Sequence, residues 1–441
     1  MKTLPMLLST IIAPVCSFAQ TYDTTFTGAS GTDYRWDNPD NWSNGIPSES
    51  SNILIESEGL STNNLAISGT IAVNTVEWNI VGSAAKQKGL SGGTLKANSI
   101  TIDSTSYWSQ LFCQGGSFDA TNEAGTGIMT IKSSGSSLHF KAATIKADIL
   151  HLASGGFLEI EKGGSVENPI ISVNKYIQVD TSINVTSTSD DSYLRFGGIR
   201  GDGVITAKDG SNVASGYIEL VNTDSSTFSG RLLLSNPDWG GSTNKSIHLT
   251  MNGSSIGVQY LTNSESSVSS VTVKNGEISM IAKNAGAISV EGGVLSVYDN
   301  GGTITDNVLN ADSLSWSGGT IKLAIGMDFN SKIALSGELT KAEGAGGMNL
   351  QLSISEDVAY ELSEMLKSED SITRDLITYS STNFDPADTS ISVTGLEDFM
   401  YELNFGDTAL SVTITQVPEP FAASLIAAVA VAGALALRRR R

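Results

Sequence analysis

The sequence has few of the residues that build disulfides and metal sites. It contains two cysteines and three histidines among 441 residues. Cys16 lies in an N-terminal segment that we expect to be removed, so Cys113 is left without a partner for an internal disulfide. No set of His, Cys and carboxylate residues stands at metal-ligand spacing around Cys113, which predicts a buried or inert thiol. Stability must therefore come from packing and from backbone hydrogen bonds.

Catalytic signatures are lacking as well. None of His139, His151 and His248 belongs to a helical metal-binding pair, although adjacent coils of a solenoid could bring His139 and His151 together. The sequence contains no Gly-x-Ser-x-Gly elbow, phosphate-binding loop or dinucleotide fingerprint. The glycine-aspartate stretch at 197–203 occurs once and departs from the calcium-binding nonapeptide spacing, so we interpret it as a turn. We therefore expect no metal, no cofactor and no enzymatic activity.

Positive charge is also scarce. Lysine and arginine total 26 against 46 acidic residues, which gives a net charge of −20. Charged residues make up 16% of the chain, against about 25% in typical soluble domains. An anionic surface repels phosphate backbones, so we expect no nucleic-acid partner.

The N-terminus has the three parts of a secretory signal. Lys2 supplies a positive charge, residues 4–15 form a short apolar run, and small residues at positions 17 and 19 precede Gln20. This order predicts that signal peptidase cleaves between Ala19 and Gln20 and removes residues 1–19.

Two other interpretations of this segment are open. Lipid attachment at Cys16 would make the chain a lipoprotein, but Val15 stands where that signal requires a small residue. A retained membrane helix is disfavoured by the shortness of the apolar run and by Pro14.

The C-terminus, residues 417–441, combines a motif, an apolar segment and a positive end. The apolar stretch 421–437 is at the short limit for a helix that spans a bilayer. The motif consists of Pro418, Glu419 and Pro420, and the positive end consists of Arg438, Arg439, Arg440 and Arg441. Terminal arginines hold the end of such a helix on the cytoplasmic side, which predicts that the motif faces outward from the inner membrane.

This ordered tail resembles the PEP-CTERM sorting signals of exported proteins from exopolysaccharide-producing Gram-negative bacteria. The resemblance covers residues 417–441. It implies that an exosortase, a membrane transpeptidase with a cysteine nucleophile, recognises Pro418, Glu419 and Pro420 after transient anchoring in the inner membrane. The chain would then reach the cell surface, the outer membrane or the extracellular matrix. The alternative is an ordinary C-terminal membrane anchor that follows a Pro-Glu-Pro loop.

Residues 61–350 consist of short runs that alternate apolar with small polar residues. Runs at 271–273 and 288–290 are examples, and pairs such as Asn275-Gly276 supply the positive φ that tight turns require. Three short strands per coil would give a repeat of roughly 20 to 25 residues. We expect an all-β fold with a right-handed parallel β-helix, and β-sandwich modules are the alternative.

Part of this region resembles the autotransporter-associated β-strand repeat. Gly201-Asp202-Gly203 leads a strand, Asn222-Thr223 marks a turn, and Phe228-Ser229-Gly230 opens the next strand. Polar residues inserted at 207–216 depart from that pattern. The resemblance implies a solenoid passenger. We expect no self-exporting autotransporter, because nothing in the sequence resembles an outer-membrane translocator.

The flanking segments 20–60 and 351–416 are expected to cap the solenoid. Trp36 and Trp42 stand among Asn, Gly and Pro turn residues and could cover the first coil. The stretch 36–47 that contains them resembles the opening segment of the same surface proteins. The alternative is that both tryptophans form a platform on which a sugar ring stacks. In the C-terminal segment, a helix-like run begins near Ser355 with acidic residues in its first turn, and strand patterns then resume.

Together these features predict an exported structural or interaction protein of the cell surface or exopolysaccharide matrix. The runner-up is an adhesin that binds extracellular polysaccharide through tryptophans, with Trp108, Trp239 and Trp316 joining the N-terminal pair. A third hypothesis is a β-helix polysaccharide lyase or glycosidase, which needs paired carboxylates on neighbouring coils. The strands carry mainly Ser, Thr and Asn with few basic residues, which disfavours that hypothesis.

Overall fold

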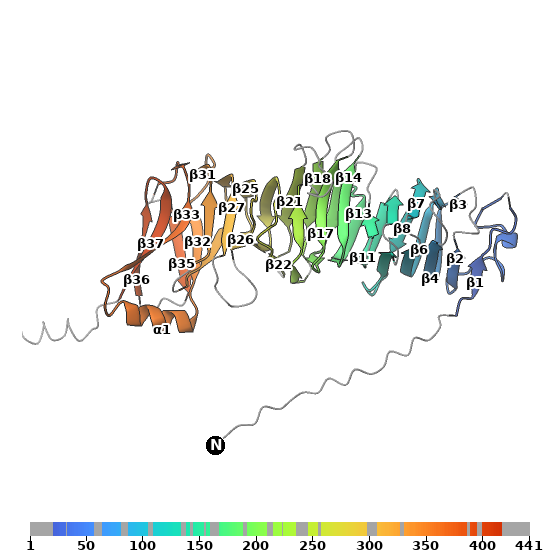
Figure 1. Cartoon of the computed structure of the whole chain (residues 1–441), viewed down its shortest axis with the longest axis horizontal. Helices are drawn as coiled ribbons and strands as arrows, with labels where there is room; N and C mark the ends of the chain where they lie inside the picture. The colour runs from blue at the N-terminus through green and yellow to red at the C-terminus, as the bar shows by residue number, and fades with distance from the viewer. Residues whose placement is uncertain are drawn as a thin grey trace, which may run out of the picture.

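The alternating apolar and polar residues fold into one elongated β-solenoid in the computed structural model of the chain (Figure 1). The structure describes residues 21–416 except for positions 32, 57–63, 81–86, 105–108, 134–137, 142–143, 154–155, 159–166, 188–191, 210–214, 223, 235–245, 255–256, 298–306, 327–329, 386–388 and 395–398. The expected signal peptide and the tail 417–441 lie outside the described residues. Within the described ranges, no helix is long and apolar enough to cross a membrane.

A 17-stranded sheet, which we call the long sheet, runs along the whole solenoid. All of its strand pairs are parallel. It contains β1 (Thr24–Phe26), β2 (Asn52–Glu56), β4 (Thr70–Ile80), β6 (Thr94–Ser104), β8 (Ser117–Ala120), β9 (Ile128–Ser133), β11 (Thr144–Leu152), β13 (Ile171–Val179), β15 (Ser192–Phe196), β16 (Ile199–Arg200), β18 (Ser215–Leu220), β21 (Ser246–Asn252), β23 (Ser270–Asn275), β25 (Ala287–Val290), β28 (Ser313–Trp316), β31 (Glu338–Lys341) and β34 (Ser381–Thr382).

Four shorter sheets form the other sides of the solenoid. The five-stranded sheet of the N-terminal half contains β3 (Leu65–Ala66), β5 (Gln87–Ser91), β7 (Ser109–Gln114), β10 (Leu138–Lys141) and β12 (Gly156–Leu158). A three-stranded sheet contains β14 (Ser182–Ser187), β17 (Val204–Asp209) and β20 (Arg231–Leu233). The seven-stranded sheet contains β19 (Ser226–Phe228), β22 (Val258–Leu261), β24 (Glu277–Met280), β26 (Val294–Val297), β29 (Thr320–Ala324), β32 (Met348–Ser353) and β35 (Thr389–Thr394). The C-terminal five-stranded sheet contains β27 (Val308–Ala311), β30 (Lys332–Leu335), β33 (Ile372–Thr378), β36 (Phe399–Phe405) and β37 (Ala409–Gln416).

The length of a coil varies along the stack. Val76 pairs with Ile100 on the next coil, whereas Val271 pairs with Ile288, so the second of these coils is clearly shorter than the first. The repeat length expected from the sequence therefore describes some coils, is too long for others, and is too short for the coil that pairs Ile218 with Leu249. A single parallel stack of this kind confirms the all-β solenoid and excludes separate β-sandwich modules, in which antiparallel strands would face each other.

Inward-facing side chains at matching register positions form a continuous apolar column. Ile53, Val76, Ile100, Met129 and Leu150 follow one another coil by coil, and each is at most 2% exposed. Burial of side chains of this size stabilises the fold by about 1.5–3 kcal/mol each. Apolar packing in this column therefore stabilises the stack without disulfides.

The parallel stacking extends past the expected limits of the solenoid. At the N-terminal end, β1 already pairs with β2, and both precede residue 61. At the C-terminal end, β34 and β35 still pair in parallel with the preceding coil, although both follow residue 350.

An α-helix and an antiparallel hairpin lie near the C-terminal end (Figure 1). Helix α1 (Glu356–Met365) begins after Ser355, whose side chain accepts a hydrogen bond from the backbone N–H of Val358, and it buries Leu362. Strand β37 pairs antiparallel with both β33 and β36, so the parallel pattern ends here. The helix agrees with the sequence pattern, whereas nothing in the sequence indicated the antiparallel pairing.

Candidate functional site

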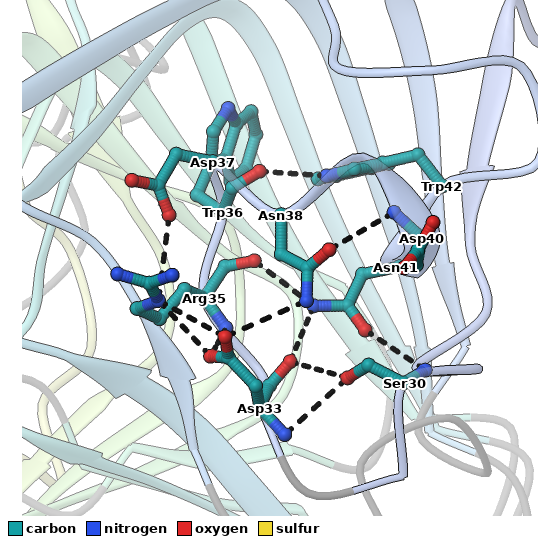
Figure 2. Close-up of polar contacts among 9 residues, drawn as sticks. All are labelled: Ser30, Asp33, Arg35, Trp36, Asp37, Asn38, Asp40, Asn41 and Trp42. Carbon is teal, nitrogen blue, oxygen red and sulfur yellow. Dashed lines mark hydrogen bonds and ion pairs between the residues drawn. The ribbon is translucent and has the colours of Figure 1, made fainter.

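Trp36 and Trp42, the predicted N-terminal pair, pack together at the N-terminal end of the solenoid (Figure 2). Each is 4% exposed. The ring of Trp42 lies edge-on to Trp36 at 4.7 Å and to Phe26 at 5.1 Å between centroids. The indole Nε1 of Trp42 donates a hydrogen bond of 2.9 Å to the backbone carbonyl of Trp36. Both rings are therefore part of the core that covers β1 and β2.

Polar residues of the Asn-Pro-Asp-Asn segment hold these rings in place. Asn38 accepts a hydrogen bond from the backbone N–H of Asp40 and caps the short 3-10 turn Pro39–Asn41. The fully buried Asn41 donates to the carbonyl oxygens of Asp33 at 2.6 Å and Arg35 at 3.0 Å (Figure 2). Such satisfied buried amides fix a loop in one conformation. A sugar could stack on either indole only after this network had opened, so the geometry favours the covering role over the sugar platform.

The other tryptophans give no exposed aromatic surface within the described residues. Trp316 is 3% exposed and lies 6.4 Å from Phe384 between ring centroids, and Trp78 is fully buried. Trp108 and Trp239 lie outside the described residues. The remaining expected site residues also lie outside them, namely Ala19, Gln20, Pro418, Glu419, Pro420, Arg438, Arg439, Arg440 and Arg441.

An asparagine ladder, which the sequence analysis missed, joins four successive coils. The amide nitrogen of Asn74 donates to the side-chain oxygen of Asn52 at 2.9 Å. Asn98 donates to Asn74 at 3.1 Å, and Asn122 donates to Asn98 at 3.3 Å. Each amide both donates and accepts, so the hydrogen bonds continue from coil to coil along the axis. The signal in the sequence was the nearly even spacing of asparagines at positions 52, 74, 98 and 122.

A buried carboxylate extends the asparagine ladder by two coils. Asp148 is 2% exposed, and its Oδ2 accepts hydrogen bonds from the backbone N–H groups of Gly127 at 2.9 Å and Asn122 at 3.1 Å. Its Oδ1 accepts from the amide of Asn174 at 2.7 Å. Three donors surround this carboxylate, which explains how an acidic side chain is tolerated inside the stack. We assign it a structural role.

The histidines stand on three different strands. His139 belongs to β10 and His151 to β11, and these two strands lie in different sheets. His151 contacts Asp180 at 2.8 Å. His248 stacks on Tyr217 at 4.7 Å between ring centroids, on the outward side of the long sheet. Among the described residues, no group of three His, Cys, Asp or Glu side chains is placed to hold a metal ion.

No family model, no curated protein and no solved structure matches this chain.

Proposed function

We propose that the chain is an exported surface or matrix protein whose acidic β-solenoid acts as a structural spacer. The observation that supports this is the long sheet, which continues from strands near the N-terminus to strands near the C-terminus at the opposite end (Figure 1). In such a stack each coil contacts only its neighbours, so the number of coils fixes the length of the rod. The full chain carries a net charge of −20, and five of its basic residues lie in the two terminal segments, so the rod itself is more acidic and its charge keeps it soluble. We further expect the coil to be right-handed, as almost all parallel β connections are.

Export and sorting complete this proposal. Signal peptidase would remove residues 1–19, and the tail 417–441 would pause in the inner membrane with its terminal arginines on the cytoplasmic side. An exosortase-like enzyme would then recognise Pro418, Glu419 and Pro420 and release the protein to the cell surface, the outer membrane or the extracellular matrix. No catalytic role is needed for the chain itself.

Alanine replacement of Pro418-Glu419-Pro420 tests the sorting step. We expect the variant to accumulate uncleaved in the inner membrane, because the processing enzyme loses its recognition site. The measurement is membrane fractionation with an immunoblot for size and location. A matched control replaces Ser48-Glu49-Ser50, three exposed residues at the other end of the solenoid, and should be delivered normally. Normal size and surface delivery of the tail variant would refute the proposal.

The adhesin is the second candidate, and it now needs a different site. Trp36, Trp42 and Trp316 are core residues and offer no ring to a glycan. A hollow on the seven-stranded sheet, lined by Tyr260, Glu277 and Lys322, provides an independent basis for sugar binding.

A further inference from the structure

Two neighbouring hollows open on the seven-stranded sheet. The first has a volume of about 410 Å³ and is lined by Tyr260, Glu277, Ser296, Lys322 and Gln351, among others. The second has a volume of about 460 Å³ and lies at the corner formed by Gly253, Asn275, Gly276, Gly292 and Gly293. Glu277 lines both of them, so they adjoin along the sheet.

The register of the strands explains the first hollow. Tyr260, Ser279, Ser296, Lys322 and Gln351 occupy the same position on five successive coils. Parallel strands lie about 4.8 Å apart, so two coils with serine leave a gap of about 14 Å between the Tyr260 and Lys322 backbones. Ser296 lines the hollow between Tyr260 and Lys322, whereas Ser279 is 1% exposed and does not line it.

An ion pair crosses this hollow. Lys322 Nζ lies 2.9 Å from Glu277 Oε2, and these residues come from coils that are two steps apart. The lysine side chain is 33% exposed and the glutamate side chain 23% exposed. Both charged groups therefore remain accessible from solvent, and a partly exposed pair costs little to rearrange around a ligand.

The chemistry of the lining selects a class of ligand. Lys322 can only donate hydrogen bonds, Glu277 can only accept them when ionised, and the Gln351 amide and the Ser296 hydroxyl can do both. Tyr260 adds an aromatic ring with an apolar surface. An apolar wall with a few convergent donors and acceptors is typical of small-molecule sites. Adjacent hydroxyl groups on a sugar ring match a donor and an acceptor that lie side by side.

Charge distinguishes between neutral and acidic sugars. Glu277 stands at the junction of the two hollows, and the whole chain carries a net charge of −20. An anionic ligand would be repelled at long range and would compete with Glu277 for Lys322. A neutral ligand meets neither penalty.

We propose that the two hollows bind a neutral oligosaccharide, with Tyr260 against one sugar ring and with Lys322 and Glu277 hydrogen-bonded to its hydroxyl groups. The glycine-lined corner would take the next sugar, because it adjoins the first hollow at Glu277. The ligand therefore spans more than one sugar unit. This inference goes beyond the spacer role, since a passive rod needs no ligand.

Affinity measurements on the purified full chain test the proposal. The probes are neutral hexasaccharides of glucose, mannose and xylose, with oligogalacturonate as the acidic counterpart, measured by isothermal titration calorimetry. We expect binding of at least one neutral probe and an affinity at least tenfold lower for Tyr260→Ala, which removes the aromatic wall. Glu277→Gln keeps the shape of the site but removes the charged acceptor, and it should also weaken binding tenfold or more.

Matched controls separate the site from general effects. Tyr401→Ala changes a tyrosine that is 40% exposed at the C-terminal end, and Glu343→Gln changes an exposed carboxylate outside both hollows. Both should keep full affinity, and circular dichroism should show the same thermal midpoint for Glu277→Gln as for the unaltered chain. Absence of neutral binding, unchanged affinity in Glu277→Gln, or a preference for oligogalacturonate would each overturn the proposal. None of these results affects the sorting test, so the spacer proposal stands or fails separately.

Discussion

Replacement of Asp148 by alanine tests whether the buried end of the asparagine ladder holds neighbouring coils together. The carboxylate accepts from two backbone N–H groups, those of Gly127 and Asn122, and from the amide of Asn174. Alanine removes all three acceptor contacts and leaves the buried Gly127 N–H without its partner. The variant should therefore be destabilised locally, where these coils meet.

The size of the effect follows from these contacts. Hydrogen bonds to a charged group contribute about 1.5–3 kcal/mol each, and an unsatisfied buried donor costs about 1–3 kcal/mol. The Asn122 N–H is only half-buried and can turn to water, which reduces its share. We expect Asp148→Ala to lower the free energy of local opening by about 3–5 kcal/mol. Asp148→Asn keeps an oxygen for the backbone donors, so its cost should be only about 1–2 kcal/mol.

Hydrogen exchange measured by mass spectrometry is the suitable assay, because coils contact only their neighbours and a solenoid need not unfold in one step. The Gly127 amide should exchange faster by about two to four orders of magnitude in Asp148→Ala. The control is Glu123→Ala, which removes an exposed carboxylate from the same loop. Equal protection of Gly127 in Asp148→Ala and in the control would refute a structural role for Asp148.

Three further predictions concern stability and reactivity. Trp42→Ala should destabilise the chain by about 3–5 kcal/mol in urea unfolding, because the ring is buried and its Nε1 is hydrogen-bonded; an unchanged midpoint would contradict the covering role. Burial raises the pKa of Asp180, but hydrogen bonds from Gln178 and His151 and the charge of His151 outweigh it, so the pKa is lowered overall. The stability that Asp180 contributes is therefore present above the unfolded pKa of about 3.9 and is lost as the pH falls below it. Asp180→Asn should show a shallower fall in thermal midpoint between pH 5 and pH 2, and an identical acid profile would contradict this assignment. Burial raises the pKa of the Cys113 thiol to about 12, although the hydrogen bond from the Leu90 N–H acts in the opposite direction. Iodoacetamide at pH 8 should therefore label Cys113 much more slowly in the native chain than in urea, and equal labelling rates would contradict this prediction.

The sequence predicted the solenoid because alternation and turns are local signals. The run at 288–290 alternates in the sequence and forms β25, and Asn275-Gly276 forms a turn with Gly276 at φ 79°. Alternation does not, however, encode the direction in which two strands pair. The run at 410–414 also alternates apolar with polar residues, but the antiparallel partners of β37 depend on contacts across the end of the stack.

Contacts between coils were largely hidden from the sequence. The asparagine ladder requires Asn74 and Asn98 to occupy equivalent corners, yet each asparagine by itself indicates only a turn. Glu277 and Lys322 lie far apart in the sequence and meet because of the particular lengths of two intervening coils. Since coil length varies along the chain, spacing alone could not align these residues. The sequence likewise allows Trp36 and Trp42 to be either buried or exposed. Their burial depends on the loop conformation that the Asn41 amide fixes through its hydrogen bonds to two backbone carbonyls.

The direction of the hydrogen bonds in the long sheet determines how the rod would respond to tension. Strands run across the rod, so the bonds between coils lie along its axis, and a pull on the two ends stretches them directly (Figure 1). Coils at an end have a neighbour on one side only, and they would detach first, one after another. A coil such as the one from Val76 to Ile100 would add about 80 Å of extended chain when released. A rod held at both ends would therefore lengthen in steps under load and dissipate a sudden force before its attachment broke.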